Sequence, residues 1–225
     1  MADQLFKRRK SALLREKNKI QKNRSQRWLF VCEGSKTEPN YIKRLIEYYN
    51  QKSDEADIIV TAEGTGRNTV SLVESVDDFL DKTAEYRRNS LIPYEKIFVL
   101  FDKDSFGAEN FNRAIALCES KGYIPIWSNE CFELWYLLHF EYYQCDSGRQ
   151  VYYEKLSERL GEEYDKADNI FDKIHSDESI KRAYHNARKL IEEQADEASA
   201  AKKIPCTQMP VLIDMLEEKL KIKIV

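Results

Sequence analysis

Four short apolar runs, each followed by a segment whose apolar residues recur with helical spacing, limit what this chain can fold into. The runs are residues 28–32 (WLFVC), 57–62 (DIIVTA), 96–101 (KIFVLF) and 123–127 (YIPIW). A short continuous apolar run suits a strand that is buried on both faces. Four strand–helix units in succession imply a parallel sheet wrapped by helices. We therefore predict an α/β fold.

Polar and turn-forming residues indicate where the helices of these units begin and end. The first strand is expected to end at Glu33, with Thr37 capping the helix that follows and Pro39 in its first turn. A capping box is expected over 71–74, and Gly122 is expected to end the helix after the third run.

Beyond Gln150 the strand signals stop and the pattern becomes helical. The expected helices lie near residues 150–160, 166–175, 178–200 and 207–221. We divide the chain into a basic N-terminal helix or arm (1–27), an α/β domain (28–145) and a helical C-terminal region (146–225). Because no low-complexity linker separates the last two parts, we expect them to pack together.

The charge is divided unevenly along the chain. The chain has 36 basic and 39 acidic residues and a formal net charge of −3, yet residues 1–27 carry ten basic and two acidic residues. The arm is therefore strongly positive and the remainder strongly negative. Such an arm can hold a polyanion, and Arg8, Arg9 and Lys10 are candidate nucleic-acid-binding residues. The alternative is a solvated leader with no binding role.

The cysteines indicate a reducing environment. The five cysteines are odd in number and show no close ligand spacing, which argues against a zinc finger or a disulfide framework. Cys32, Cys118 and Cys131 stand in apolar runs, where a free thiol behaves as a small buried hydrophobic group. No stretch approaches the roughly 18 apolar residues of a membrane span. We expect a cytoplasmic protein that does not enter a membrane.

Acidic residues follow two of the predicted strands. Glu33 comes after the first strand, and Asp102 and Asp104 come after the third. Ligands of open α/β sheets bind at the carboxyl ends of the strands, and two carboxylates in an extended segment can share one Mg²⁺ ion. Gathered carboxylates repel one another, and a cation relieves this repulsion. The alternative for the Asp pair is a turn or helix cap.

Further charged residues are placed near this edge. Glu130 and Glu133 follow the fourth strand; both can serve a helix start, but Glu133 stands among apolar residues and needs a partner. Glu38 can hold a second ion or merely complement a helix dipole. Lys36 and Lys103 stand beside the carboxylates as candidate phosphate contacts.

Three strings carry a resemblance to a known family. Residues 31–41 (VCEGSKTEPNY), 101–105 (FDKDS) and 128–140 (SNECFELWYLLHF) resemble the signature blocks of the RloB family, a branch of the Toprim fold. Toprim domains carry a glutamate after the first strand and an Asp-x-Asp after the third. The resemblance implies that Glu33, Asp102 and Asp104 hold Mg²⁺, or Mn²⁺ in its place. Glu133 matches the glutamate of the family's third block. Where the family more often has Asn-Pro, this chain has Asn-Glu, which leaves Glu130 without an implied role.

The resemblance implies a metal-dependent endonuclease that cleaves phosphodiester bonds in antiphage defence of the abortive-infection kind, often beside an ATPase partner. RNA, such as tRNA, and DNA are both possible substrates. The protein can also form a homo-oligomer. The expected catalytic residues are Glu33, Asp102, Asp104 and Glu133, with Glu38 as a further metal ligand.

Two alternatives remain. The chain can be a non-catalytic nucleic-acid-binding or regulatory subunit of an ATPase-containing complex, or can perform strand transfer like a topoisomerase or primase. Strand transfer requires additional domains for which the chain has no room.

Overall fold

The computed structural model describes residues 25–54, 57–86, 93–104, 106–166 and 168–225. Residues 1–24 of the predicted N-terminal helix or arm (1–27), with Arg8, Arg9 and Lys10, lie outside these residues.

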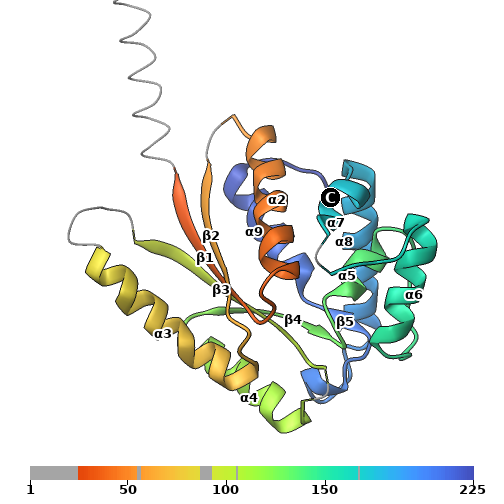
Figure 1. The fold of residues 1–225 in the computed structure, drawn as a ribbon, viewed down its shortest axis with the longest axis horizontal. Coiled ribbons are helices and arrows are strands. Elements are labelled where there is room, and N and C mark those ends of the chain that lie inside the picture. Colours follow the sequence, from red (N-terminus) through yellow and green to blue (C-terminus); the bar gives the residue numbers. More distant parts are fainter. Residues whose placement is uncertain (1–24, 55–56, 87–92, 105, 167) are drawn as a thin grey trace, which may run out of the picture.

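A five-stranded sheet forms the centre of the fold (Figure 1). Strands β1 (Gln26–Cys32), β2 (Ile58–Gly64), β3 (Tyr94–Asp102) and β4 (Ile124–Asn129) are parallel, and β5 (Cys206–Thr207) runs antiparallel to β4. The strand order is β2-β1-β3-β4-β5. The four predicted strands are confirmed within a few residues at each end. The two-residue strand β5 is not predicted, because so short an element carries no periodic signal.

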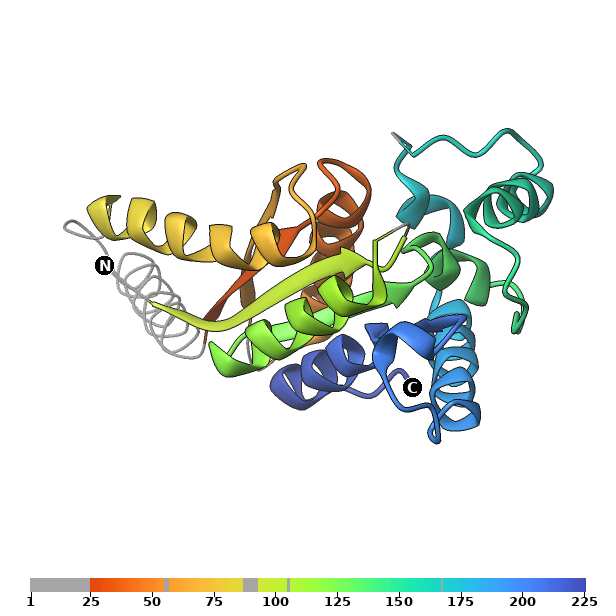
Figure 2. The same cartoon turned by 90° about the horizontal axis from the view of Figure 1, so that it is seen from below.

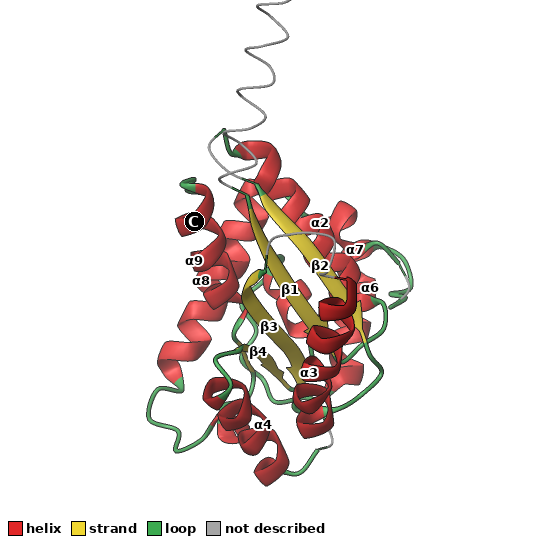
Figure 3. Cartoon of the chain, turned by 90° about the vertical axis from the view of Figure 1, so that its left-hand side faces the viewer, coloured by secondary structure: helices red, strands yellow, loops and turns green. Residues whose placement is uncertain are grey.

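Helices cover both faces of the sheet (Figure 3), which explains why the strand sequences are apolar without alternation. In β1, Leu29 and Val31 face α3 (Thr69–Tyr86) and α4 (Ala108–Ser120). The alternate residues Trp28, Phe30 and Cys32 belong to the core on the opposite face.

The core that contains Trp28, Phe30 and Cys32 joins the sheet to the C-terminal helices. It is built from α2 (Thr37–Lys52) and α5 (Glu133–Leu138) together with the helices of the C-terminal region. Those helices are α6 (Arg149–Leu160), α7 (Ile170–Ile174), α8 (Asp177–Glu193) and α9 (Met209–Leu220). The expected α/β fold with a parallel sheet, flanking helices and a helical C-terminal region is confirmed. The boundary predicted after residue 145 falls in the loop between α5 and α6.

Two of the predicted helix boundaries are wrong. Thr37 is the first residue of α2 rather than its cap, and its hydroxyl donates to the carbonyl oxygen of Lys166 at 3.3 Å. Ser71 lies inside α3 and donates to the carbonyl oxygen of Asn68, so the capping box over 71–74 does not form. A capping box is present instead at Ser176 of α8. Gly122 follows α4 in a left-handed conformation, as predicted.

The apolar setting predicted for the cysteines is confirmed. Cys32, Cys118 and Cys131 are buried free thiols, as is Cys206, whereas Cys145 is exposed. Across the described part of the chain, every helix is too short or too polar to cross a membrane.

Shortening the Leu216 side chain in α9 should destabilise the sheet and the C-terminal helices together. Leu216 is fully buried in the shared core, so Leu216→Ala should lower the free energy of unfolding by about 2–5 kcal/mol in one cooperative transition. Urea denaturation followed by circular dichroism measures this. Ile59→Thr is the control, because Ile59 is 45% exposed and its replacement should change stability by less than about 0.5 kcal/mol. Two separate transitions in Leu216→Ala would contradict a shared core.

Candidate functional site

A pocket of about 490 Å³ opens at the carboxyl ends of β1 and β3. Figure 2 shows β3 pointing toward the helices of the C-terminal region, and the pocket lies where they meet. Its walls combine charged side chains of both signs with Gly34, Ser35, Thr37 and Phe132. The acidic ones are Glu33, Glu38, Asp102, Asp104, Glu133 and Asp165, and the basic ones are Lys36, Arg149 and Lys166.

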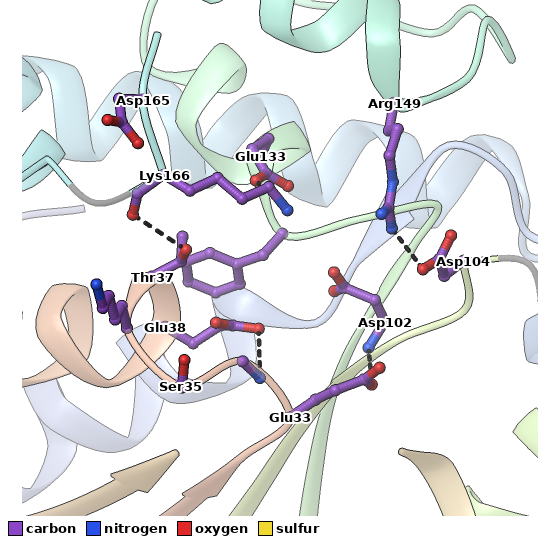
Figure 4. A pocket seen from close by; sticks show the side chains of 13 residues that line it. Glu33, Ser35, Thr37, Glu38, Asp102, Asp104, Glu133, Arg149, Asp165 and Lys166 are labelled. Atoms are coloured by element: carbon purple, nitrogen blue, oxygen red, sulfur yellow. Dashed lines mark hydrogen bonds and ion pairs between the residues drawn. The ribbon is translucent and has the colours of Figure 1, made fainter. Parts of the chain in front are cut away.

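The loop between β1 and α2 is fixed by its backbone. The amide of Glu33 donates to the carbonyl oxygen of Leu100 at 2.9 Å, and the amide of Asp102 donates to Glu33 Oε2 at 3.2 Å. These bonds hold the end of β1 against the end of β3. The Glu33 carboxylate is therefore placed by the sheet itself (Figure 4).

Two glycines allow close approaches around this loop. A side chain at Gly34 would overlap the carboxylate of Glu38, whose Oε1 accepts a hydrogen bond from the Gly34 amide at 3.3 Å. A side chain at Gly64 would overlap the backbone of Gly34 and Ser35. Gly64, the last residue of β2, therefore lets the end of that strand pack directly against the β1–α2 loop.

The geometric reason given for the Asp pair is wrong, although both residues reach the pocket. Asp102 is the last residue of β3, but Asp104 lies in a turn with φ of +43°, so the segment is not extended. The turn forms because the amides of Lys103 and Asp104 donate to the carbonyl oxygens of Ser128 and Glu130. Asp104 Oδ2 then lies 2.6 Å from Arg149 Nη2.

Two buried glutamates complete the acidic wall. Glu38 lies in the first turn of α2 and Glu133 is the first residue of α5; they are 5% and 1% exposed. Glu133 Oε1 accepts from Lys166 Nζ at 3.2 Å and from the Tyr164 hydroxyl at 3.2 Å. The expectation that Glu133 needs a partner is confirmed.

The carboxylates of the pocket disfavour one another's charge. Burial raises the pKa of Glu33 to about 7, and the nearby charges of Glu38 and Asp104 add to the effect. Burial likewise raises the pKa of Asp102 well above its usual value, and Glu38, Glu133 and Glu33 raise it further. Burial and the charge of Glu133 raise the pKa of Glu38. The site is therefore short of positive charge.

The donor chemistry of this pocket fits a hard divalent cation, because carboxylate oxygens are the ligands that Mg²⁺ prefers. Nowhere in the described ranges do three His, Cys, Asp or Glu side chains form a ready ligand group. Two of the carboxylates are instead paired with basic side chains, Asp104 with Arg149 and Glu133 with Lys166.

The structure brings most of the predicted site residues together. Glu33, Glu38, Asp102, Asp104, Glu133 and Lys36 all line the pocket. Lys103 does not line it, because its Nζ turns to the carbonyl oxygen of Asp104 at 3.3 Å. Glu130 is also outside the lining, as its lack of an implied role suggested.

His139 has a structural role. Its Nδ1 lies 2.9 Å from the Trp135 carbonyl oxygen and its Nε2 lies 3.3 Å from the Tyr41 hydroxyl. Because the carbonyl can only accept, Nδ1 carries the proton and Nε2 accepts from the hydroxyl. Burial lowers the pKa of His139 to about 4, so the ring is neutral at physiological pH.

Sequence reasoning missed Arg149 and Lys166. Both come from the C-terminal region, outside the strand ends and sequence blocks from which the site residues were predicted. One signal was available: Arg149 begins α6, where a positive charge opposes the helix dipole and therefore needs an acidic partner. Lys166 lies in a loop and carries no comparable signal.

Removal of one carboxylate should stabilise the metal-free protein above neutral pH. The pKa of Glu33 is about 4.5 when unfolded and about 7 when folded, so the wild type loses stability as the pH rises through this window. Glu33→Gln avoids this loss and should gain about 1–2 kcal/mol at pH 8 relative to pH 4, less than the full shift implies because Glu33 is part-exposed. Urea unfolding in EDTA measures the gain.

Glu158→Gln is the matched control, because Glu158 is exposed on α6 outside the pocket. A stability difference between Glu33→Gln and the wild type that stays constant from pH 4 to pH 8 would show that folding does not raise the pKa of Glu33.

The chain was compared with curated proteins, solved structures and protein families. Neither the curated proteins nor the solved structures gave a match. Among protein families, the one described as RloB-like protein matches residues 28–216. This range includes every acidic and basic residue that lines the pocket. A match over most of the 225 residues means that the chain belongs to the RloB-like family.

Proposed function

We propose that this protein is a Toprim-type endonuclease that hydrolyses phosphodiester bonds with Mg²⁺, or with Mn²⁺ in its place, and acts in antiphage defence. One observation carries the proposal: five carboxylates, from the residue after β1, α2, the end of β3, the turn after β3, and α5, line one pocket at the carboxyl edge of a parallel sheet. Membership of the RloB-like family supports it.

Glu33 and Asp102 are the residues best placed to hold the first cation. Glu33 directly follows β1 and Asp102 is the last residue of β3, and the hydrogen bond from the Asp102 amide to Glu33 Oε2 fixes their relative position. Glu38 and Asp104 flank them and would complete the ligand set. When bound, a divalent cation neutralises charge on the phosphate and lowers the pKa of a coordinated water.

The chain's own residues prepare the site for this chemistry. Glu38 and Glu133 are buried beside Asp102, and their charge opposes the approach of a phosphate unless a cation or basic side chains offset it. Lys36 is exposed on the pocket wall, where it can meet phosphate oxygens from the solvent side. We propose an extended phosphodiester chain as the substrate, with Lys36 as a contact to its phosphates.

Cleavage should depend on the metal and on the sheet-edge carboxylates. We expect the wild type to cleave at least one of labelled tRNA, single-stranded RNA, single-stranded DNA or duplex DNA with Mg²⁺ or Mn²⁺, and to cleave none in EDTA. Asp102→Asn should lower the rate by about 10²-fold or more, because it removes charge that the cation requires. Gel analysis of each substrate measures the rate and identifies the preferred nucleic acid.

Glu130→Gln is the matched control: Glu130 is an acidic neighbour that does not line the pocket, so this variant should cleave at the wild-type rate. Equal rates in Asp102→Asn and the wild type would contradict the proposal. Nucleic-acid binding without cleavage under any of these conditions, unchanged in Asp102→Asn, would favour a non-catalytic subunit. The ATPase partner and a homo-oligomer remain predictions.

A further inference from the structure

We propose that Arg149 and Lys166 form a phosphate-binding pair that holds the nucleic-acid backbone over the carboxylates. This inference rests on the proposed function of the pocket and names the residues that bring its substrate there. Both residues belong to the helical C-terminal region, whose contribution to the site the family blocks leave unassigned.

The two side chains enter the pocket from different positions in the C-terminal region (Figure 4). Arg149 is the first residue of α6 and reaches Asp104 at the end of the turn after β3. Lys166 lies in the loop before α7 and reaches Glu133. A phosphodiester chain that crosses the pocket therefore passes between two cationic groups.

Arg149 has donors to spare. Its guanidinium carries five N–H donors in a planar fork, and Asp104 lies 2.6 Å from Nη2. The Nε atom is buried and has no hydrogen-bond partner within the described part of the chain. A buried N–H without an acceptor is costly, and the fork geometry matches phosphate as well as carboxylate. A phosphate that takes the place of Asp104 along the Nε–Nη2 edge of the fork would satisfy this donor.

Lys166 is the outer member of its ion pair. Its side chain is 49% exposed, whereas that of Glu133 is 1% exposed. The ammonium group lies 5.2 Å from the centre of the Tyr153 ring, and the Thr37 hydroxyl donates to the Lys166 carbonyl oxygen, which anchors the loop to α2. Lys166 therefore stands between the solvent and the buried carboxylate, where an arriving phosphate meets it first.

The pocket needs such a pair because its carboxylates repel a polyanion. Basic side chains beside them lower this repulsion and set where the backbone docks. The Arg149–Asp104 pair is part-exposed on both sides, and such pairs contribute little to stability, so exchange of Asp104 for a phosphate costs little. The ammonium group of Lys166 has three N–H donors, so it can meet a phosphate oxygen while it stays paired with the buried Glu133.

Binding without cleavage tests the pair directly. Fluorescence anisotropy in EDTA measures the affinity for labelled tRNA and for single-stranded and duplex DNA over a range of salt concentrations. Arg149→Met and Lys166→Met should each weaken binding about tenfold and reduce the slope of log K against log salt by about 0.7–0.9, the loss of one phosphate contact.

Arg159→Met and Lys173→Met are matched controls that remove the same charge. Arg159 lies on α6 and pairs with Glu141, and Lys173 lies on α7 and pairs with Glu162 and Asp168, all outside the pocket. They should bind within about twofold of the wild type. Arg149→Lys keeps the charge and loses the fork, so it should keep the salt slope and lose part of the affinity. It also serves if Arg149→Met fails to fold.

Wild-type affinity in both pocket variants would overturn the inference, as would equal losses in the controls or failure of the wild type to bind any of the probes. The outcomes separate this inference from the proposed function. Selective binding losses in a wild type that never cleaves with Mg²⁺ or Mn²⁺ would support the pair and refute the nuclease. Normal binding by the variants of a wild type that does cleave would refute only the pair.

Discussion

Repulsion among carboxylates at one edge of the sheet is the constraint on which the rest of the site depends. A parallel sheet brings the ends of β1 and β3 together, so acidic residues at those ends are forced close. Burial raises the pKa values of Glu33 and Asp102, and the charges of the neighbouring carboxylates raise them further. A structure retains such a cost where function requires the charges, because stability alone would favour their replacement.

The sheet was predictable because its strands are buried on both faces. Continuous apolar runs of this kind have few alternatives, and the order of strand and helix then dictates parallel pairing. Glu33 and Asp102 could be placed from the same signal, since each follows a strand directly. The sequence placed Asp104 in the pocket but did not predict its backbone conformation. The turn that positions Asp104 depends on the carbonyl oxygens of Ser128 and Glu130, which come from a different part of the chain.

The contribution of the C-terminal region could not be predicted from sequence. Its helices were recognised, but their placement against α2 and α5 depends on the packing of a shared core rather than on local periodicity. That packing carries Arg149 and Lys166 into the pocket and anchors the Lys166 loop through Thr37. The predicted cap at Thr37 was wrong for the same reason: its hydroxyl is used in a contact across the fold instead of at its own helix end.

The proposed divalent-metal centre at the sheet edge can be tested by anomalous scattering from crystals grown with Mn²⁺. We expect an anomalous peak within coordination distance of both Glu33 and Asp102, and its loss in Asp102→Asn crystals grown under the same conditions. No peak at the pocket with saturating Mn²⁺, or a peak that persists in Asp102→Asn, would contradict it.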